Sequence, residues 1–257
     1  MSFVDGYVKS PLAGIAPWVL LSIVSGPGRF EEAASAALGL TLITLWVGWR
    51  RGVPIHALEV FGAVFFAVLA ALGLFASDGV IGWLETWAGE VSNVALALFA
   101  IVGLLLRKPF TIAYAKDTTP SEHWESPLFK RINYAISAAW AAAFTFSAIM
   151  GALGDTVWPG GEFWTAWILP IAAVLFAVQF TEFYPDYAGA KFAQSIGETT
   201  EPPRSLLSLV DWIPPFILVT GIVGWVSDAI PDVAGIALIV LGAAGSALLR
   251  KSVKAKT

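Results

Sequence analysis

The sequence predicts an all-α membrane protein, a polytopic transmembrane helical bundle of about eight spans with the N and C termini in the cytoplasm. Composition is the first observation behind this prediction, because 57% of the residues are hydrophobic, 13% are charged and the mean hydropathy is +0.75. Soluble domains carry about 25% charged residues. The second observation is a series of long apolar stretches, and the third is the placement of basic residues beside alternate ends of these stretches.

The apolar stretches define the predicted spans. A transmembrane helix needs about 20 mostly apolar residues. The first stretch is the weakest, because Pro11 and Pro17 interrupt it, and the count falls to seven if this stretch is re-entrant. No long flexible linker divides the others, so residues 1–257 are expected to form a single integral membrane domain. The predicted spans lie near 11–26, 33–49, 55–75, 91–106, 133–153, 163–184, 208–226 and 233–249.

Basic residues set the predicted orientation, because Lys and Arg accumulate in cytoplasmic loops. Threading the spans from a cytoplasmic N-terminus puts all of the 15 Lys and Arg residues except Arg29 on the cytoplasmic side. The outer connection 78–90 has apolar residues at helical spacing, with Trp83 and Trp87 suited to the headgroup layer. This segment is therefore predicted to be an amphipathic helix on the outer surface.

The central cytoplasmic loop, residues 107–132, is the most distinctive segment outside the spans. Pro109 is expected to end or begin a helix, Thr119 or Ser121 to cap a turn, and Pro127 to break that turn. The loop is half apolar, so it should dock on the membrane surface or over the bundle. Its basic residues either contact anionic phospholipid headgroups or only follow the orientation rule. The candidate headgroup or loop contacts are Arg107, Lys108, Lys116, Trp124, Lys130 and Arg131.

Polar residues within the spans gather toward the predicted cytoplasmic end. Charge is costly to bury in hydrocarbon, so such residues are the first place to look for function. Glu59 follows His56 by three residues and Glu182 follows Gln179 by three, which puts each pair on one helix face. The alternative is charge pairing that only fixes helix packing. The candidate cytoplasm-facing polar vestibule comprises His56, Glu59, Gln179, Glu182 and Asp211.

The sequence gives little support to catalysis of the kind known from soluble enzymes. The chain has no Cys, only 2 His and no HExxH signature, so we expect no resident metal, no cofactor and no catalytic residue. No Gly-rich phosphate loop or nucleophile elbow occurs. The basic residues are scattered among short loops, which argues against nucleic acid as a partner. The expected partners are the lipid bilayer, anionic phospholipids and other membrane proteins.

Part of the chain resembles a known family. RKPF at Arg107 to Phe110 is followed by Trp124, Pro127, Asn133 and the stretch AAWAAAF at 138–144. This succession resembles the intracellular septation protein A-like inner-membrane proteins, over about residues 55–180. The chain departs from that family in extra spans at both ends and in a longer central loop. The resemblance implies a multi-pass protein of the bacterial inner membrane that serves cell-envelope maintenance or division through partners, and it supplies no catalytic residues.

Three functions stay open at this point. The first is a non-enzymatic envelope protein whose last span approaches a partner closely, or else packs within its own bundle, through the small residues Gly235, Gly242, Gly245 and Ser246. The second is a small-solute transporter or channel that uses the vestibule, and spans interrupted at Pro170, Pro214 and Pro215 are typical of that class. The third is a membrane enzyme that acts on lipid or isoprenoid substrates at the cytoplasmic face.

Overall fold

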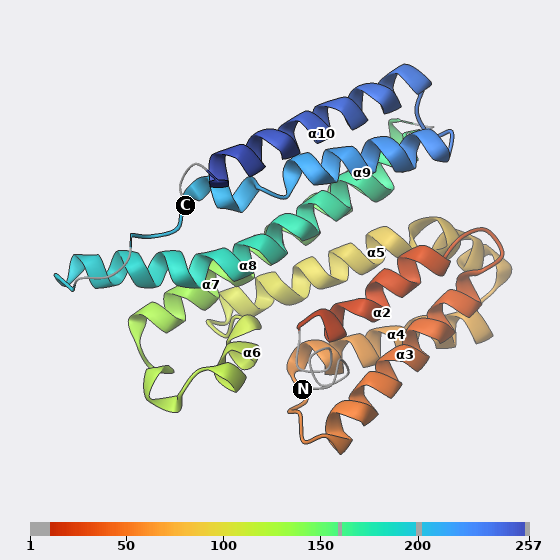
Figure 1. Ribbon diagram of the computed structural model, residues 1–257. Helices are drawn as coiled ribbons and strands as arrows, with labels where there is room; N and C mark the ends of the chain where they lie inside the picture. Colours follow the sequence, from red (N-terminus) through yellow and green to blue (C-terminus); the bar gives the residue numbers. More distant parts are fainter. Residues whose placement is uncertain (1–10, 159–160, 199–201, 255–257) are drawn as a thin grey trace. The chain divides into compact units, whose positions relative to one another are not determined.

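The computed structural model describes residues 11–158, 161–198 and 202–254, and every regular element within them is a helix (Figure 1). The all-α class is therefore confirmed. The chain forms two compact units, Met1–Glu125 and Ser126–Thr257, and each is described by itself. A single integral membrane domain stays a prediction. Lys9 and Lys256, which count toward the predicted charge asymmetry, lie outside the described residues.

The first unit is built around α3, which packs between α2 and α4, while α2 also contacts α4 and α5. The apolar core of this unit includes Trp18, Leu21, Phe30 and Phe66, all buried. The ring of Trp18 stacks on Phe65, with 4.8 Å between the ring centroids. The described elements of the unit are α2 (Pro11–Val24), α3 (Phe30–Arg50), α4 (Ala57–Phe75), α5 (Asp78–Leu105), α6 (Thr111–Thr118) and the 3₁₀ turn η1 (Ser121–His123).

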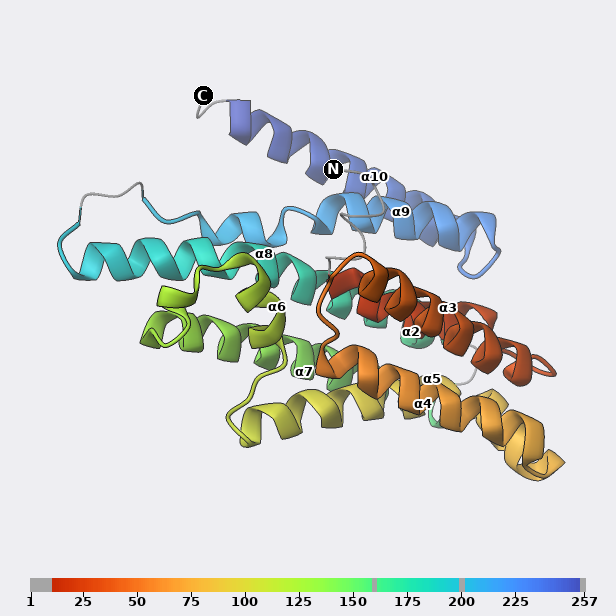
Figure 2. The same cartoon turned by 90° about the horizontal axis from the view of Figure 1, so that it is seen from below.

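The second unit consists of two helical hairpins. Helix α7 packs along α8, and α9 packs along α10 (Figures 1 and 2). The indole N–H of Trp140 on α7 donates a hydrogen bond of 3.0 Å to Thr181 Oγ1 on α8, which links the helices of the first hairpin. The described elements are α7 (Pro127–Thr156), the π-helical η2 (Phe163–Ile168), α8 (Leu169–Ser195), the 3₁₀ turn η3 (Leu206–Val210), α9 (Ile213–Val226) and α10 (Asp232–Lys254).

Glycines allow the close approach of α9 and α10. A Cβ atom on Gly221 of α9 would lie 2.8 Å from the backbone nitrogen of Ile239 on α10, and one on Gly242 would overlap the backbone nitrogen of Leu218. Gly235 faces Trp225 and Gly245 faces Pro214 at similarly short range. Small residues permit such contacts between apolar helices. Of the two roles left open for the small residues of the last span, the structure shows packing against the neighbouring helix of the same chain.

Seven described helical segments are long and apolar enough to cross a membrane, as in a multi-pass membrane protein. Helix α2 is not one of them: its 14 residues rise only about 21 Å, and the hydrocarbon core of a bilayer is about 30 Å thick. The number of spans, and the side of the membrane on which each end lies, stay predictions.

Several helices extend beyond their predicted boundaries. The segment 78–90 is helical, but it is continuous with the following span in the 28-residue α5 instead of forming a separate helix. Pro127, predicted to break a loop turn, lies in the first turn of α7, where its missing N–H removes no hydrogen bond. The N-cap residue Ser126 accepts a hydrogen bond of 3.1 Å from the backbone N–H of Phe129. Helix α8 continues past the predicted end at 184 to Ser195, with Pro185 inside it.

The other prolines of the predicted interrupted spans lie where the helix type changes or a helix begins. Pro170 follows the π-helical η2, which runs without a break into α8, whereas Pro214 and Pro215 are in the first turn of α9. Proline favours a first turn because its fixed φ suits the helix and its N–H is not needed there. The backbone ahead of each is irregular, π-helical in η2 and 3₁₀ in η3. The expected irregularity of these two spans is therefore present at their starts.

The end of α5 holds a residue other than glycine in the left-handed conformation. Arg107 has a φ of 57°. Hydrogen bonds from Arg107 N to Leu104 O (3.0 Å) and from Lys108 N to Gly103 O (2.8 Å) complete a helix-capping motif in which glycine usually takes this place. Gly52, with a φ of 69°, takes the equivalent place after α3. The sequence therefore keeps an exposed cation at a position where its backbone is strained.

We expect Arg107→Gly to raise the free energy of unfolding by about 1 kcal/mol, because glycine adopts the left-handed conformation without a clash at Cβ. Thermal unfolding of the detergent-purified protein would measure this change. Arg51→Gly is the matched control, since Arg51 precedes Gly52 and has a φ of −99°. That substitution should lower stability, because there glycine only adds freedom to the unfolded chain. A fall in stability for Arg107→Gly would contradict the expectation.

Candidate functional site

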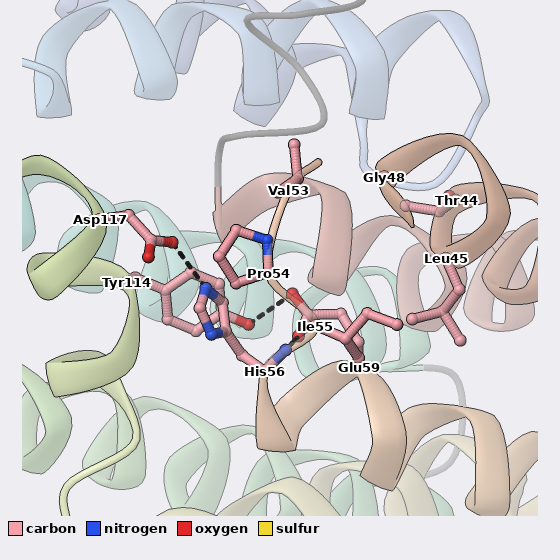
Figure 3. A pocket seen from close by; sticks show the side chains of 10 residues that line it. All are labelled: Thr44, Leu45, Gly48, Val53, Pro54, Ile55, His56, Glu59, Tyr114 and Asp117. Carbon is pink, nitrogen blue, oxygen red and sulfur yellow. Dashed lines mark hydrogen bonds and ion pairs between the residues drawn. The ribbon is translucent and has the colours of Figure 1, made fainter. Parts of the chain in front are cut away.

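A pocket at the beginning of α4 is the candidate site (Figure 3). It encloses about 400 Å³ of empty space, its open mouth included. Its walls come from three parts of the first unit: the end of α3, the connection into α4 with the first turn of that helix, and α6. The lining residues are Thr44, Leu45, Gly48, Val53, Pro54, Ile55, His56, Glu59, Tyr114 and Asp117.

Backbone hydrogen bonds near the connection between α3 and α4 fix the position of Glu59 in the first turn of α4. Gly52 ends α3, and the backbone N–H of Val53 bonds back to Gly48 O at 2.9 Å. The chain then runs extended to His56, the N-cap of α4. Glu59, in the third helical position, accepts a hydrogen bond of 2.8 Å from the backbone N–H of His56 at Oε2. Glutamate is favoured at this position because it can accept such a bond.

Helix α6 supplies the other half of the site. The hydroxyl of Tyr114 donates a hydrogen bond of 2.8 Å to Glu59 Oε1. His56 Nε2 lies 2.7 Å from Asp117 Oδ2, and the rings of His56 and Tyr114 meet edge to face at 4.5 Å between centroids (Figure 3). Tyr114 and Asp117 are three residues apart and so lie on one face of α6. These four side chains form a polar network that ties α6 to the start of α4.

The pocket is acidic. It contains two carboxylates and one imidazole, and no Lys or Arg is among the described residues that line it. The Asp117 side chain is 36% exposed, whereas Glu59 is half-buried, so Asp117 is the carboxylate nearer to solvent. A concave surface lined by one sign of charge attracts the opposite charge. Leu45, Val53 and Ile55 give the same pocket an apolar wall. The arrangement suits a small cation with an apolar part.

Tyr114 is held in its neutral form. Burial raises the pKa of its hydroxyl above the ordinary value, and the negative charge and hydrogen bond of Glu59 raise it further, as does the charge of Asp117. A neutral tyrosine can donate to Glu59, whereas a tyrosinate could not. The hydrogen bond between α6 and α4 therefore persists through the pH range in which free tyrosines ionise.

This raised pKa predicts a pH dependence of stability. The contribution of Tyr114 is fully present below the unfolded pKa of about 10 and is lost as the pH rises above it, because only the unfolded chain then releases the proton. Above pH 10, the wild type should lose up to about 1.4 kcal/mol per pH unit more than Tyr114→Phe, which has no proton to release. Unfolding measured between pH 9 and about 11.5 would test this, with Tyr134→Phe as a control for loss of a hydroxyl. Parallel curves for the wild type and Tyr114→Phe would contradict it.

The structure brings together two of the five predicted vestibule residues. His56 and Glu59 share the pocket, as their spacing predicted, together with Tyr114 and Asp117, which were not predicted as site residues. Gln179 and Glu182 lie on α8, and Asp211 lies in the turn between η3 and α9, all in the second unit. Gln179 is half-buried, whereas Glu182 and Asp211 are exposed. A vestibule shared by all five stays a prediction.

Among the predicted loop contacts, the structure pairs Lys116 with Trp124. Lys116 Nζ lies 4.7 Å from the centroid of the Trp124 ring, and the indole N–H of Trp124 donates to Thr119 O at 2.9 Å. This cation–π contact holds the end of α6 against the turn that follows it. Arg107 and Lys108 are exposed after α5, and Lys130 and Arg131 are exposed near the start of α7. Recognition of phospholipids by these residues stays a prediction.

Together, the fold and the pocket define a class: a multi-pass helical membrane protein with an acidic pocket at one end of a helix bundle. In the part of the chain that the structure describes, no group of three or more His, Asp or Glu side chains is arranged to hold a metal ion. Comparison with protein-family models, with curated proteins and with solved structures finds no match for the chain. The resemblance to septation protein A-like proteins stays a prediction, so the function is argued from the pocket.

Proposed function

We propose that the protein is a small-solute transporter or channel that binds a small organic cation in the acidic pocket of the first unit. The observation that carries the proposal is the placement of Glu59 and Asp117, two carboxylates, beside a single imidazole in a pocket open to solvent. An isolated pair of buried carboxylates would be costly, and here each accepts a hydrogen bond and faces a cavity that a cation could fill.

The geometry favours an ammonium ion over a bare metal ion. A primary ammonium group has three N–H donors on a compact charge. The carboxylates of Glu59 and Asp117 retain further acceptor positions beyond the bonds they make, because each ionised carboxylate offers about four. The apolar wall would receive the carbon part of an amine, a contact that a metal ion cannot use. Arg50 and Arg51 at the end of α3 support the proposal that this side faces the cytoplasm, because basic residues accumulate there.

Ligand-dependent unfolding tests the binding step. Methylammonium chloride should raise the unfolding midpoint of the detergent-purified wild type along a saturating curve, by an amount equivalent to about 2.7 kcal/mol at 100 times the dissociation constant. Tetramethylammonium, which has no N–H donor, should have a smaller effect, and sodium acetate should have none beyond that of ionic strength. The methylammonium effect should disappear in Asp117→Asn and weaken in Glu59→Gln.

A second His–carboxylate pair in the same loop supplies the matched control. His123 and Glu122 lie 3.5 Å apart, with side chains 60% and 77% exposed, outside the pocket. Glu122→Gln removes the same charge as Asp117→Asn and should leave the methylammonium effect unchanged. An equal methylammonium effect in Asp117→Asn and Glu122→Gln would show that the pocket is not the binding site. Uptake of labelled methylammonium by proteoliposomes would then distinguish a transporter from a protein that only binds the cation.

The other functions have less support from the geometry. The described pocket offers no Ser, Cys or Lys nucleophile to a lipid or isoprenoid enzyme. The glycines of α10 pack against α9, so they no longer argue for a partner helix. A role in envelope maintenance or division through partners, and a place in the bacterial inner membrane, stay predictions that rest on the family resemblance.

A further inference from the structure

A second cavity lies directly behind the pocket. It is lined by residues of α2, α3 and α4, and it shares Thr44, Leu45 and Glu59 with the pocket, so the two spaces adjoin at these residues. This inner cavity, its opening included, holds about 240 Å³ of empty space, and the part of it that a molecule can occupy is about the size of one water. Its other lining residues are Gly14, Pro17, Trp18, Thr41, Gly62 and Phe66.

Trp18 brings an unpartnered donor to this cavity. The residue is 4% exposed, and its Nε1 is buried without a hydrogen-bond partner in the described structure. The ring cannot turn toward solvent, because it stacks on Phe65 at 4.8 Å and on Phe61 at 6.0 Å and lies against Phe66 at 4.7 Å between centroids. Buried indole N–H groups normally find an acceptor. The Trp18 N–H therefore points to a guest in the cavity.

The surrounding atoms define the chemistry of the guest. It must accept a hydrogen bond from Trp18, which excludes an ammonium ion, because that ion has no lone pair. It can donate to Glu59, whose oxygens have acceptor capacity left, and to Thr41, whose hydroxyl already donates to Ala37 O at 2.8 Å and is free to accept. A molecule of this size that both accepts and donates is water, which is held in protein interiors by two to four such partners.

We infer that the inner cavity is a water site bridging the Trp18 indole N–H, the Thr41 hydroxyl and the Glu59 carboxylate. Water at this position lies between α2, α3 and α4, and Glu59 lines both this cavity and the pocket. The water site does not depend on the proposed cation, because it is measured without any cation added.

Indole NMR tests the site. The full chain, labelled with ¹⁵N-tryptophan in lipid nanodiscs, has 12 indole N–H groups. The Trp18 signal is the one missing in Trp18→Phe, which keeps the aromatic stacking. If that variant does not fold, the signal is the one displaced most in Gly62→Ala. In the wild type, the Trp18 N–H should show a direct cross-relaxation peak at the water frequency. The N–H of Trp140, buried and bonded to Thr181, is the internal reference.

Gly62→Ala and Gly39→Ala form a matched pair for the same measurement. A Cβ on Gly62 would lie 3.6 Å from Trp18 Nε1, which is an ordinary contact, and it would take up space in the cavity that Gly62 lines. A Cβ on Gly39 meets nothing within 4 Å. The water peak of Trp18 should vanish in Gly62→Ala and persist in Gly39→Ala. A wild type without the peak, or a peak that survives in Gly62→Ala, would overturn the inference.

Discussion

A methyl group added at Gly242 should force α9 and α10 apart and lower the free energy of unfolding by about 1–3 kcal/mol. The new Cβ would overlap the backbone nitrogen of Leu218, and it would also lie 2.6 Å from Leu218 Cβ. Neither atom can swing aside as the end of a flexible side chain could, so one helix must move. Because the two helices touch along several glycines, a shift at Gly242 also loosens the contacts at Gly221 and Gly235.

Gly39→Ala is the control, because the change in the free energy of unfolding should have the opposite sign. Gly39 lies within α3, and a Cβ there meets nothing within 4 Å. Alanine is favoured over glycine in a helix interior by roughly 0.5–1 kcal/mol. Gly39→Ala should therefore stabilise the protein and Gly242→Ala should destabilise it, as measured by thermal unfolding in the same detergent. If both variants gain stability, the close packing of α9 on α10 is wrong.

The second large effect is expected at Glu59. Glu59→Leu leaves the Tyr114 hydroxyl and the His56 backbone N–H without an acceptor in a half-buried site. Each unsatisfied donor costs about 1–3 kcal/mol, so a total loss of roughly 3 kcal/mol is expected. Because the hydrogen bond of Tyr114 to Glu59 ties α6 to α4, loss of this bond should also make α6 more accessible to protease near Lys116.

Two comparisons separate the loss of hydrogen bonds from the loss of charge. Glu59→Gln keeps one acceptor oxygen and should cost less than Glu59→Leu. Glu85 makes a similar bond, from Gly28 N to Glu85 Oε1 at 2.7 Å, but in an exposed place where water can replace it. Glu85→Leu should therefore change the stability by less than about 1 kcal/mol. Equal losses for Glu59→Leu and Glu85→Leu would show that the polar network is not buried as described.

The helices were largely predictable because their signal is local. Long apolar stretches predicted all seven described segments that are long enough to span a membrane. The predicted helix boundaries were wrong where capping residues determine them. Pro127 looked like a breaker, yet behind the N-cap residue Ser126 it begins α7. The continuity of 78–90 with α5 was missed because a change from polar to apolar composition does not by itself end a helix.

The site was predictable only as far as its contacts are local. His56 and Glu59 were found because a spacing of three residues puts them on one helix face. Their partners come from much farther along the chain, with sequence separations of 55 for Glu59 and Tyr114 and 61 for His56 and Asp117. The spacing of Tyr114 and Asp117 could have indicated that both lie on one helix face, but the loop was interpreted from its basic residues as a contact with lipids. Likewise, the glycines of the last span were noted, whereas their partner, α9, required the fold.

The extensive helix contacts of both units join neighbours in the chain: α2 with α3, α3 with α4, α7 with α8, and α9 with α10. Closing the short connection between neighbouring helices costs little conformational entropy, and topologies built from local contacts form quickly. Each hairpin can therefore assemble as soon as its second helix leaves the ribosome, before the remaining chain has been made. The hairpin of α9 and α10 is synthesised after the other described helices, and its glycine contacts join only its own two helices, so it can close without support from an earlier helix.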